Sequence, residues 1–147
     1  MSSKYLTKSK FQVALNCETK LYYGANKKYK NKNIDDTFMA SLAEGGYQVG
    51  ELAKCYYPWG FQINELDYNT ALTRTNELLK QENVIIYEAA LCFGNLFIRA
   101  DILVKKGNSI ELIEVKAKSF KGDDSLDFLN KKGFLNTGWS PYLYDVA

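Results

Sequence analysis

Three apolar runs rich in β-branched residues follow one another in the third quarter of the chain, at residues 84–91, 96–104 and 110–117. Short turn sequences separate them, Gly94-Asn95 after the first run and Lys106-Gly107-Asn108 after the second. Apolar β-forming runs around short Gly/Asn turns are typical of hairpins. The pattern therefore predicts a three-stranded antiparallel meander.

Apolar residues at helical spacing precede the meander in three segments. Thr7 or Ser9 can cap the first helix, which we expect to continue to Gly24. Asp35 or Asp36 can cap the second, which ends at the Pro-Trp-Gly sequence of residues 58–60. A third helix is predicted at about 69–81, a short one at 125–132, and an irregular aromatic tail at 134–147.

Length and composition agree with one folded domain over residues 1–147. With 147 residues, 46% of them hydrophobic, the chain is large enough to bury a core. No apolar run approaches the roughly 18 residues that a membrane span needs, and no signal peptide opens the chain. We therefore expect a mixed α/β domain, with the central meander flanked by helices and without a membrane partner.

Cysteine and histidine usage narrows the chemistry. The three cysteines are far apart and lack CxxC spacing, which favours reduced thiols in a cytoplasmic protein. The chain has no histidine, so His-ligated zinc and Ser-His-Asp or Cys-His mechanisms are excluded. The net charge of +2 permits a nucleic-acid partner without arguing for one.

Charged residues interrupt the three apolar runs. Glu88 lies in the first run, Asp101 in the second, and Glu114 and Lys116 in the third. Because side chains alternate between the two faces of a strand, Glu114 and Lys116 are expected to face the same side, opposite to Val115. An acid and a lysine on one face in the middle of a sheet indicate a candidate metal-binding or catalytic site.

Asp101 and Glu114 would lie on neighbouring strands, close enough to share one ion. Converging carboxylates repel each other unless a cation is present, and oxygen ligands without His or Cys suit Mg²⁺ or Mn²⁺. The main-chain carbonyl of Val115 could add a third oxygen, and Lys116 could hold a water or stabilise a phosphate. Spacing alone leaves a second interpretation open, in which these charges lie on a solvent-exposed face of the sheet.

Asp101, a twelve-residue gap and then Glu114-Val115-Lys116 resemble the D…(D/E)-x-K motif of the restriction-endonuclease-like PD-(D/E)XK nucleases. The predicted order of helix, three strands and helix is similar to the core of that superfamily. Other segments resemble its RecB-like exonuclease branch, so that the resemblance covers nearly the whole chain. Residues 6–11 and 17–22 look like the opening helix of this branch, and residues 46–53, 87–89 and 99–103 look like one uncharacterised bacterial subgroup.

The resemblance implies a divalent-metal-dependent nuclease that hydrolyses phosphodiester bonds, of DNA rather than RNA. In this assignment Asp101 and Glu114 bind Mg²⁺ or Mn²⁺, and Lys116 is catalytic. Glu88 matches a strand glutamate of the subgroup and is placed at the same site. Two alternatives remain, a catalytically inactive nucleic-acid-binding domain and a purely structural domain on the same fold.

The sequence departs from the family pattern in three places. Many RecB-like members carry a metal-binding His on the helix before the sheet, where this chain has Gly50, so Glu51 or Glu44 could supply that ligand instead. Members with an iron–sulfur cluster use four cysteines, which this chain lacks, so we expect Cys17 to be buried packing. Members also continue past Ala147 into a further helix and strand, which implies that this chain is a fragment.

Overall fold

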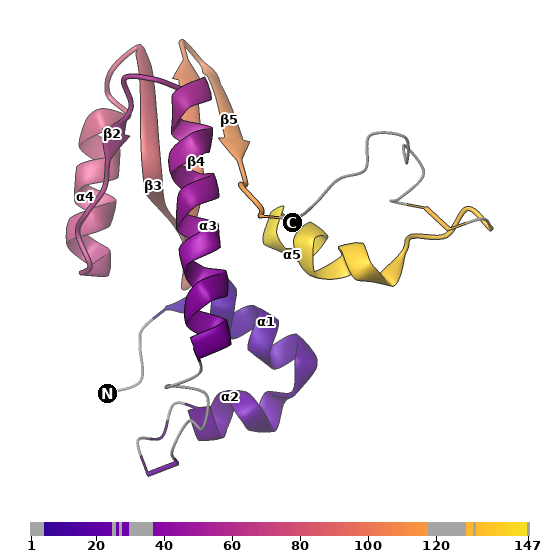
Figure 1. The fold of residues 1–147 in the computed structure, drawn as a ribbon. Coiled ribbons are helices and arrows are strands. Elements are labelled where there is room, and N and C mark those ends of the chain that lie inside the picture. The colour runs from indigo at the N-terminus through magenta and orange to yellow at the C-terminus, as the bar shows by residue number, and fades with distance from the viewer. Residues whose placement is uncertain are drawn as a thin grey trace. The chain divides into compact units, whose positions relative to one another are not determined.

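The structure is a computed structural model, which describes residues 5–24, 26, 28–29, 37–117, 129–130 and 132–146 (Figure 1). The chain divides into two compact units, Met1–Lys116 and Ala117–Ala147, and each is described by itself. Over the described ranges, none of the helices combines the length and the apolar character that a membrane crossing requires.

A five-stranded mixed sheet forms the centre of the first unit. β3 and β4 form a long antiparallel hairpin, and β5 continues it as a third antiparallel strand. The two short strands β1 and β2 pair in parallel with β4 and β3. The mixed α/β class and the antiparallel meander are thereby confirmed. The strands are β1 (Leu6–Thr7), β2 (Phe61–Gln62), β3 (Asn83–Phe93), β4 (Leu96–Lys106) and β5 (Ser109–Ile113).

The third strand is shorter than predicted. β5 ends at Ile113, so Glu114, Val115 and Lys116 lie in the irregular segment that follows it, not within the strand. The cause is a side chain: the N–H of Val115 donates to Oδ2 of Asp101 at 2.6 Å. A carboxylate thus takes the backbone donor that a continued β-ladder would have used.

Helix α4 (Tyr68–Leu78) covers one face of the sheet and corresponds to the helix predicted at 69–81. It begins at Asp67, whose Oδ1 accepts from the N–H and the hydroxyl of Thr70. These two bonds hold the pKa of Asp67 below its usual range. Ala71 and Thr75 are fully buried, and Oγ1 of Thr75 accepts from the N–H of Ala90 on β3 at 3.0 Å. The larger apolar core therefore lies between α4 and the sheet.

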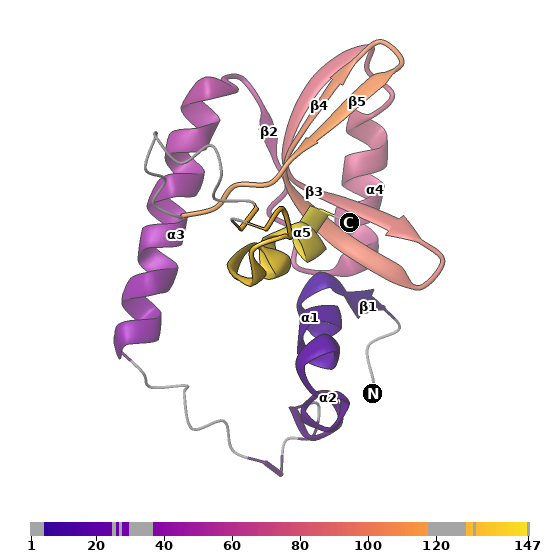
Figure 2. The same ribbon diagram turned by 90° about the vertical axis from the view of Figure 1, so that its right-hand side faces the viewer.

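Helix α3 (Thr37–Tyr56) lies on the opposite face of the sheet, as Figure 2 shows. It ends before Pro58 as predicted, whereas its predicted caps at residues 35 and 36 lie outside the described residues. Ala53 and Tyr57, near the carboxyl end of the helix, pack against a smaller core cluster of the sheet. Because α3 contacts the sheet near its carboxyl end, the preceding part of the helix leaves space between itself and the sheet.

The turn after α3 is fixed on the sheet by Tyr87 of β3. The Tyr87 hydroxyl donates to the carbonyl of Tyr57 and accepts from the N–H of Gly60 at 3.1 Å. A Cβ atom on Gly60 would lie 2.4 Å from the Tyr87 ring, so only glycine permits this approach. The carboxyl end of α3 is therefore held at a defined place on β3.

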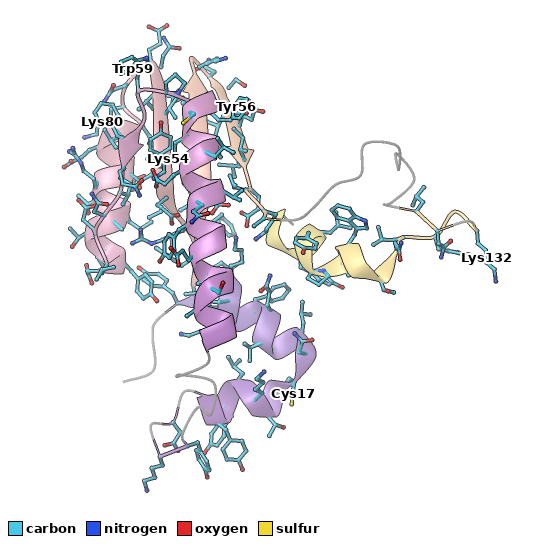
Figure 3. The ribbon with its side chains drawn as sticks, in the orientation of Figure 1. Cys17, Lys54, Tyr56, Trp59, Lys80 and Lys132 are labelled. Atoms are coloured by element: carbon cyan, nitrogen blue, oxygen red, sulfur yellow. The ribbon has the colours of Figure 1, made fainter. Side chains whose placement is uncertain are left out.

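The predicted first helix is broken into α1 (Lys8–Asn16) and α2 (Glu18–Gly24). Cys17 between them is extended; its N–H closes α1 on Val13, while its carbonyl accepts from Lys20 at 3.1 Å and begins α2. Cys17 is exposed, so its prediction as buried packing is wrong (Figure 3). The predicted cap at Thr7 is confirmed, because its Oγ1 accepts from the N–H of Lys10.

An aromatic cluster attaches the N-terminal segment to the sheet. The ring of Tyr5 lies 5.5 Å from those of Tyr68 and Phe97, and its hydroxyl donates to Oδ1 of Asn69 at 3.2 Å. Tyr5 and Phe97 are buried. Since β1 follows Tyr5 directly, this cluster sets the position at which α1 begins.

The second unit contains a bridge between Leu129 and Leu135, a 3₁₀ turn η1 (Thr137–Trp139) and helix α5 (Ser140–Val146). The irregular tail predicted at 134–147 is therefore wrong over residues 137–146. Pro141 lies in the first turn of α5, where its missing N–H costs no hydrogen bond and its fixed φ suits a helix. Most of the short helix predicted at 125–132 falls outside the described residues.

Candidate active site

Glu88 and Asp101 lie opposite each other in the central hairpin. The pairs on both sides of them are in register, Tyr87 with Ile102 and Ala89 with Ala100. Glu88 has a φ of 56°, a left-handed conformation that costs a non-glycine residue on the order of 1 kcal/mol or more. Such strain in the middle of a strand, at a carboxylate, is typical of functional positions.

Burial and crowding both act on the two carboxyl groups. Burial raises the pKa of Asp101; the Val115 N–H opposes this by hydrogen bonding, and the neighbouring Glu114 raises the pKa further. Burial also raises the pKa of Glu88, and the charge of Asp101 adds to it, while Arg99 acts in the other direction. Both carboxylates are thus held where ionisation is unfavourable.

Glu114 is held by two lysines from distant parts of the sequence. Nζ of Lys8, the first residue of α1, lies 2.7 Å from Oε1 of Glu114, and Nζ of Lys116 lies 2.6 Å from the same oxygen. The Glu114 side chain is 12% exposed. Glu114 and Lys116 are therefore in contact, and the interpretation in which these charges are merely solvated does not fit Glu114.

A cleft of about 800 Å³ opens between α3 and the sheet. The helix residues that line it recur every three or four positions, so they form one face of α3. Small residues on this face leave space that larger side chains would fill. The lining residues are Ala43, Gly46, Tyr47, Gly50, Glu51 and Lys54 from α3, with Gln62, Asn64, Glu88, Asp101, Ile102 and Val115 from the rest of the unit.

The structure brings the predicted site residues together. The cleft is lined by Glu88, Asp101, Val115 and Glu51. Glu114 and Lys116 form an ion pair and are not among the lining residues, but the charges of both act on the Asp101 carboxyl group. Glu51 is exposed and is paired with Lys54 at 2.5 Å, and Glu44, the other candidate on α3, does not line the cleft.

Lys54 also lines the cleft, and the sequence alone did not predict this. Its Nζ donates to Oε1 of Gln62 at 2.8 Å and lies 5.3 Å from the centre of the Tyr87 ring (Figure 3). Its position one turn from Gly50 and Glu51 was the available signal, because residues four apart share a helix face.

Lys8 and Arg99 were also missed. The guanidinium of Arg99 donates to the carbonyls of Ile63 and Glu65, which fixes the chain after β2 beside the acids. Lys8 lies next to the Thr7 cap in a segment assigned only a helical role. Lys8 and Glu114 are 106 residues apart in the sequence, so no local sequence pattern predicts their contact.

The donor chemistry of the cleft fits a hard divalent cation. Asp101 and Glu88 supply carboxylate oxygens, and burial, together with a neighbouring negative charge, raises the pKa of both groups. Mg²⁺ and Mn²⁺ prefer such oxygens and retain waters for their other positions. Among the side chains that the structure describes, no group of three or more His, Cys, Asp or Glu residues is arranged to hold a metal ion by itself.

No protein-family model, no curated protein and no solved structure matches this chain. The restriction-endonuclease-like core therefore stays a prediction from the D…(D/E)-x-K spacing and the flanking segments. What the fold shows is the mixed sheet with helices on both faces, and a cleft on the α3 side that holds Glu88 and Asp101.

Proposed function

We propose that this chain is a divalent-metal-dependent nuclease domain that hydrolyses phosphodiester bonds of DNA. The observation that carries the proposal is the position of Asp101: it lines the cleft opposite Glu88 and is linked by hydrogen bond and charge to the segment of Glu114 and Lys116. Asp101 thereby connects Glu88 on the neighbouring strand with the charged segment that follows β5.

The residues divide into acids that would hold the ion and a lysine that would act on the substrate. Asp101 and Glu114 would bind Mg²⁺ or Mn²⁺, with Glu88, the carbonyl of Val115 and Glu51 as further oxygen donors. A bound divalent ion would stabilise charge on the phosphate and activate water for attack. Lys116, as a compact cation with three donors, would orient the water or stabilise the developing charge on the phosphate.

A second candidate function is a catalytically inactive nucleic-acid-binding or structural domain on the same fold. One observation favours it: Oε1 of Glu114 already accepts from two ammonium groups, those of Lys8 and Lys116. An acid neutralised by lysines stabilises a fold without any ion, and lysines around a cleft would still attract phosphates.

The test is cleavage of linear and circular DNA by this chain with Mg²⁺ or Mn²⁺. Lys116→Ala should lower the rate at least about 100-fold, as the loss of one charge-stabilising donor does, while metal binding is nearly unchanged. Asp101→Asn should lose both cleavage and metal binding, because a neutral amide is a poor ligand for a hard dication. Lys80→Ala, which removes an exposed lysine outside the cleft lining, serves as the matched control and should cleave normally.

Two outcomes contradict the nuclease proposal. Equal cleavage by the wild type and Lys116→Ala would point to a contaminating activity. No cleavage by any variant with Mn²⁺ supplied, together with retained DNA binding, would favour the inactive binding domain.

A further inference from the structure

Tyr47 is an exposed aromatic residue at the cleft of the candidate active site. It lies in the middle of α3 and lines the cleft together with Glu88 and Asp101. Although it lines a cleft, it is 77% exposed. An exposed ring adds little to the core of the protein, but it offers a flat surface to a molecule that enters the cleft.

The helix around Tyr47 leaves space beside its ring. Ala43 and Gly50, four residues before Tyr47 and three after it, line the cleft on the same helix face, and both are small. At Gly46 and Gly50, apart from the adjacent residues and the helix backbone, no described atom lies within 4 Å of the position that a Cβ would take. Glycine weakens a helix, and close packing does not require it at these two positions. This part of α3 therefore keeps space open in the cleft beside the ring.

Aromatic side chains bind unpaired nucleobases by stacking, and every base has a face on which a ring can stack. In a duplex the neighbouring base pairs cover these faces, so a base has to leave the stack before a side chain can contact its face. The cleft has a volume of about 800 Å³, which is in the range of sites for small molecules. It therefore suits individual nucleotides of a single strand and not a length of duplex.

We propose that Tyr47 stacks on a base of single-stranded DNA, or of an unpaired DNA end, and thereby brings the adjoining phosphate into the cleft that Glu88 and Asp101 line. The inference rests on the proposed nuclease function and deepens it, because it gives unpaired DNA as the substrate class. It also adds a binding residue outside the D…(D/E)-x-K motif. Since stacking contacts the face of a base and not its edge, the expected preference is for unpaired DNA and not for one sequence.

The test measures binding of a single-stranded oligothymidylate that carries one fluorescent aminopurine base, and of the same strand paired with its complement. Ca²⁺ replaces Mg²⁺, so that a hard cation is present at the acids. Fluorescence anisotropy gives the Kd, and quenching of the aminopurine reports stacking. The wild type should bind the single strand more tightly than the duplex and quench the aminopurine. Tyr47→Ala should weaken single-strand binding about 5- to 150-fold, the loss typical for one stacking side chain, and should lose the quenching.

Matched variants separate stacking from other roles of the side chain. Tyr47→Phe keeps the ring and should bind and quench like the wild type, whereas Tyr47→Leu keeps only apolar bulk and should behave like Tyr47→Ala. The control is Tyr56→Ala, which removes a tyrosine of the same helix that is 78% exposed and is not among the lining residues of the cleft (Figure 3). It should leave single-strand binding unchanged.

Equal single-strand affinities of Tyr47→Ala and Tyr56→Ala overturn the inference, as does wild-type quenching by Tyr47→Leu. A wild type that cleaves duplex DNA but does not bind the single strand also overturns it, while the nuclease function stands. If the expected binding and quenching occur in a chain that cleaves no DNA with Mn²⁺, Tyr47 stacks as proposed and the nuclease function is wrong.

Discussion

The two faces of the central sheet are packed in different ways. On the α4 face, Ala71 and Thr75 of the helix are fully buried against strand residues such as Leu103. On the α3 face, contact is made near the end of the helix by Ala53 and Tyr57, and a cleft opens beside it. The same two strands, β3 and β4, supply both surfaces.

The α4 face mainly stabilises the fold, whereas the α3 face contains the groups suited to chemistry. Burial of apolar side chains on the α4 face stabilises the fold by roughly 25 cal/mol per Å² of apolar surface removed from water. The α3 face instead contains a strained Glu88 and two carboxyl groups with raised pKa values, Glu88 and Asp101. These features, which cost stability, lie on the face with the cleft, as expected where function and stability compete.

The largest effect on stability is expected on the α4 face. Leu103 is fully buried in the larger core cluster, so Leu103→Ala removes apolar contacts and leaves a cavity. We expect a loss of about 2–5 kcal/mol in the free energy of unfolding, measured by urea denaturation.

The matched control is Leu52→Ala on α3, where the leucine is 60% exposed. Its free energy of unfolding should change by less than about 0.5 kcal/mol. Similar losses for the two variants would mean that the α3 face is packed as tightly as the α4 face, and the contrast between the faces would not hold.

A smaller effect of opposite sign is expected at Glu88. Because its folded pKa is raised, ionisation destabilises the fold: the penalty begins as pH rises above the unfolded value and is complete above the folded one. Glu88→Gln removes this penalty, so it should be more stable than the wild type at pH 7 and similar at pH 3. Solvent screening of the half-exposed side chain keeps the gain below about 1 kcal/mol.

Thermal unfolding of the metal-free protein from pH 3 to pH 8 measures this gain. Glu111→Gln, an exposed acid on β5, is the control and should show a pH dependence like that of the wild type. If Glu88→Gln were less stable than the wild type at pH 7, the ionised Glu88 carboxylate would not destabilise the fold, and this account of Glu88 would be wrong.

The meander was predictable because its signals are local. Gly94 and Gly107 occupy left-handed turn positions, with φ of 59° and 56°, between apolar runs that alternate. The end of β5 was not predictable from such signals. It depends on Asp101 accepting a hydrogen bond from Val115, which is fourteen residues away. The alternation of apolar and polar residues within the strand contains no information on that bond.

The acids of the candidate site and Lys116 were predictable from the sequence, whereas Lys8 and Lys54 were not. The motif spacing placed Asp101 and Glu114 together, and the β3–β4 register then set Glu88 opposite Asp101. The contacts of Lys8 and Lys54 arise from how α1 and α3 meet the sheet. Helix placement depends on tertiary packing, which periodicity within one segment does not encode.

The most direct test of the α3-face site is the binding of Mn²⁺, followed by its EPR signal as the protein is titrated. We predict that the wild type binds Mn²⁺ and that Mg²⁺ competes for the site. Asp101→Asn should weaken binding at least about tenfold, the range seen when metal-site groups are lost, and Glu111→Gln should bind like the wild type. Equal binding by the wild type and Asp101→Asn, or no binding by the wild type, would contradict a metal site in this cleft.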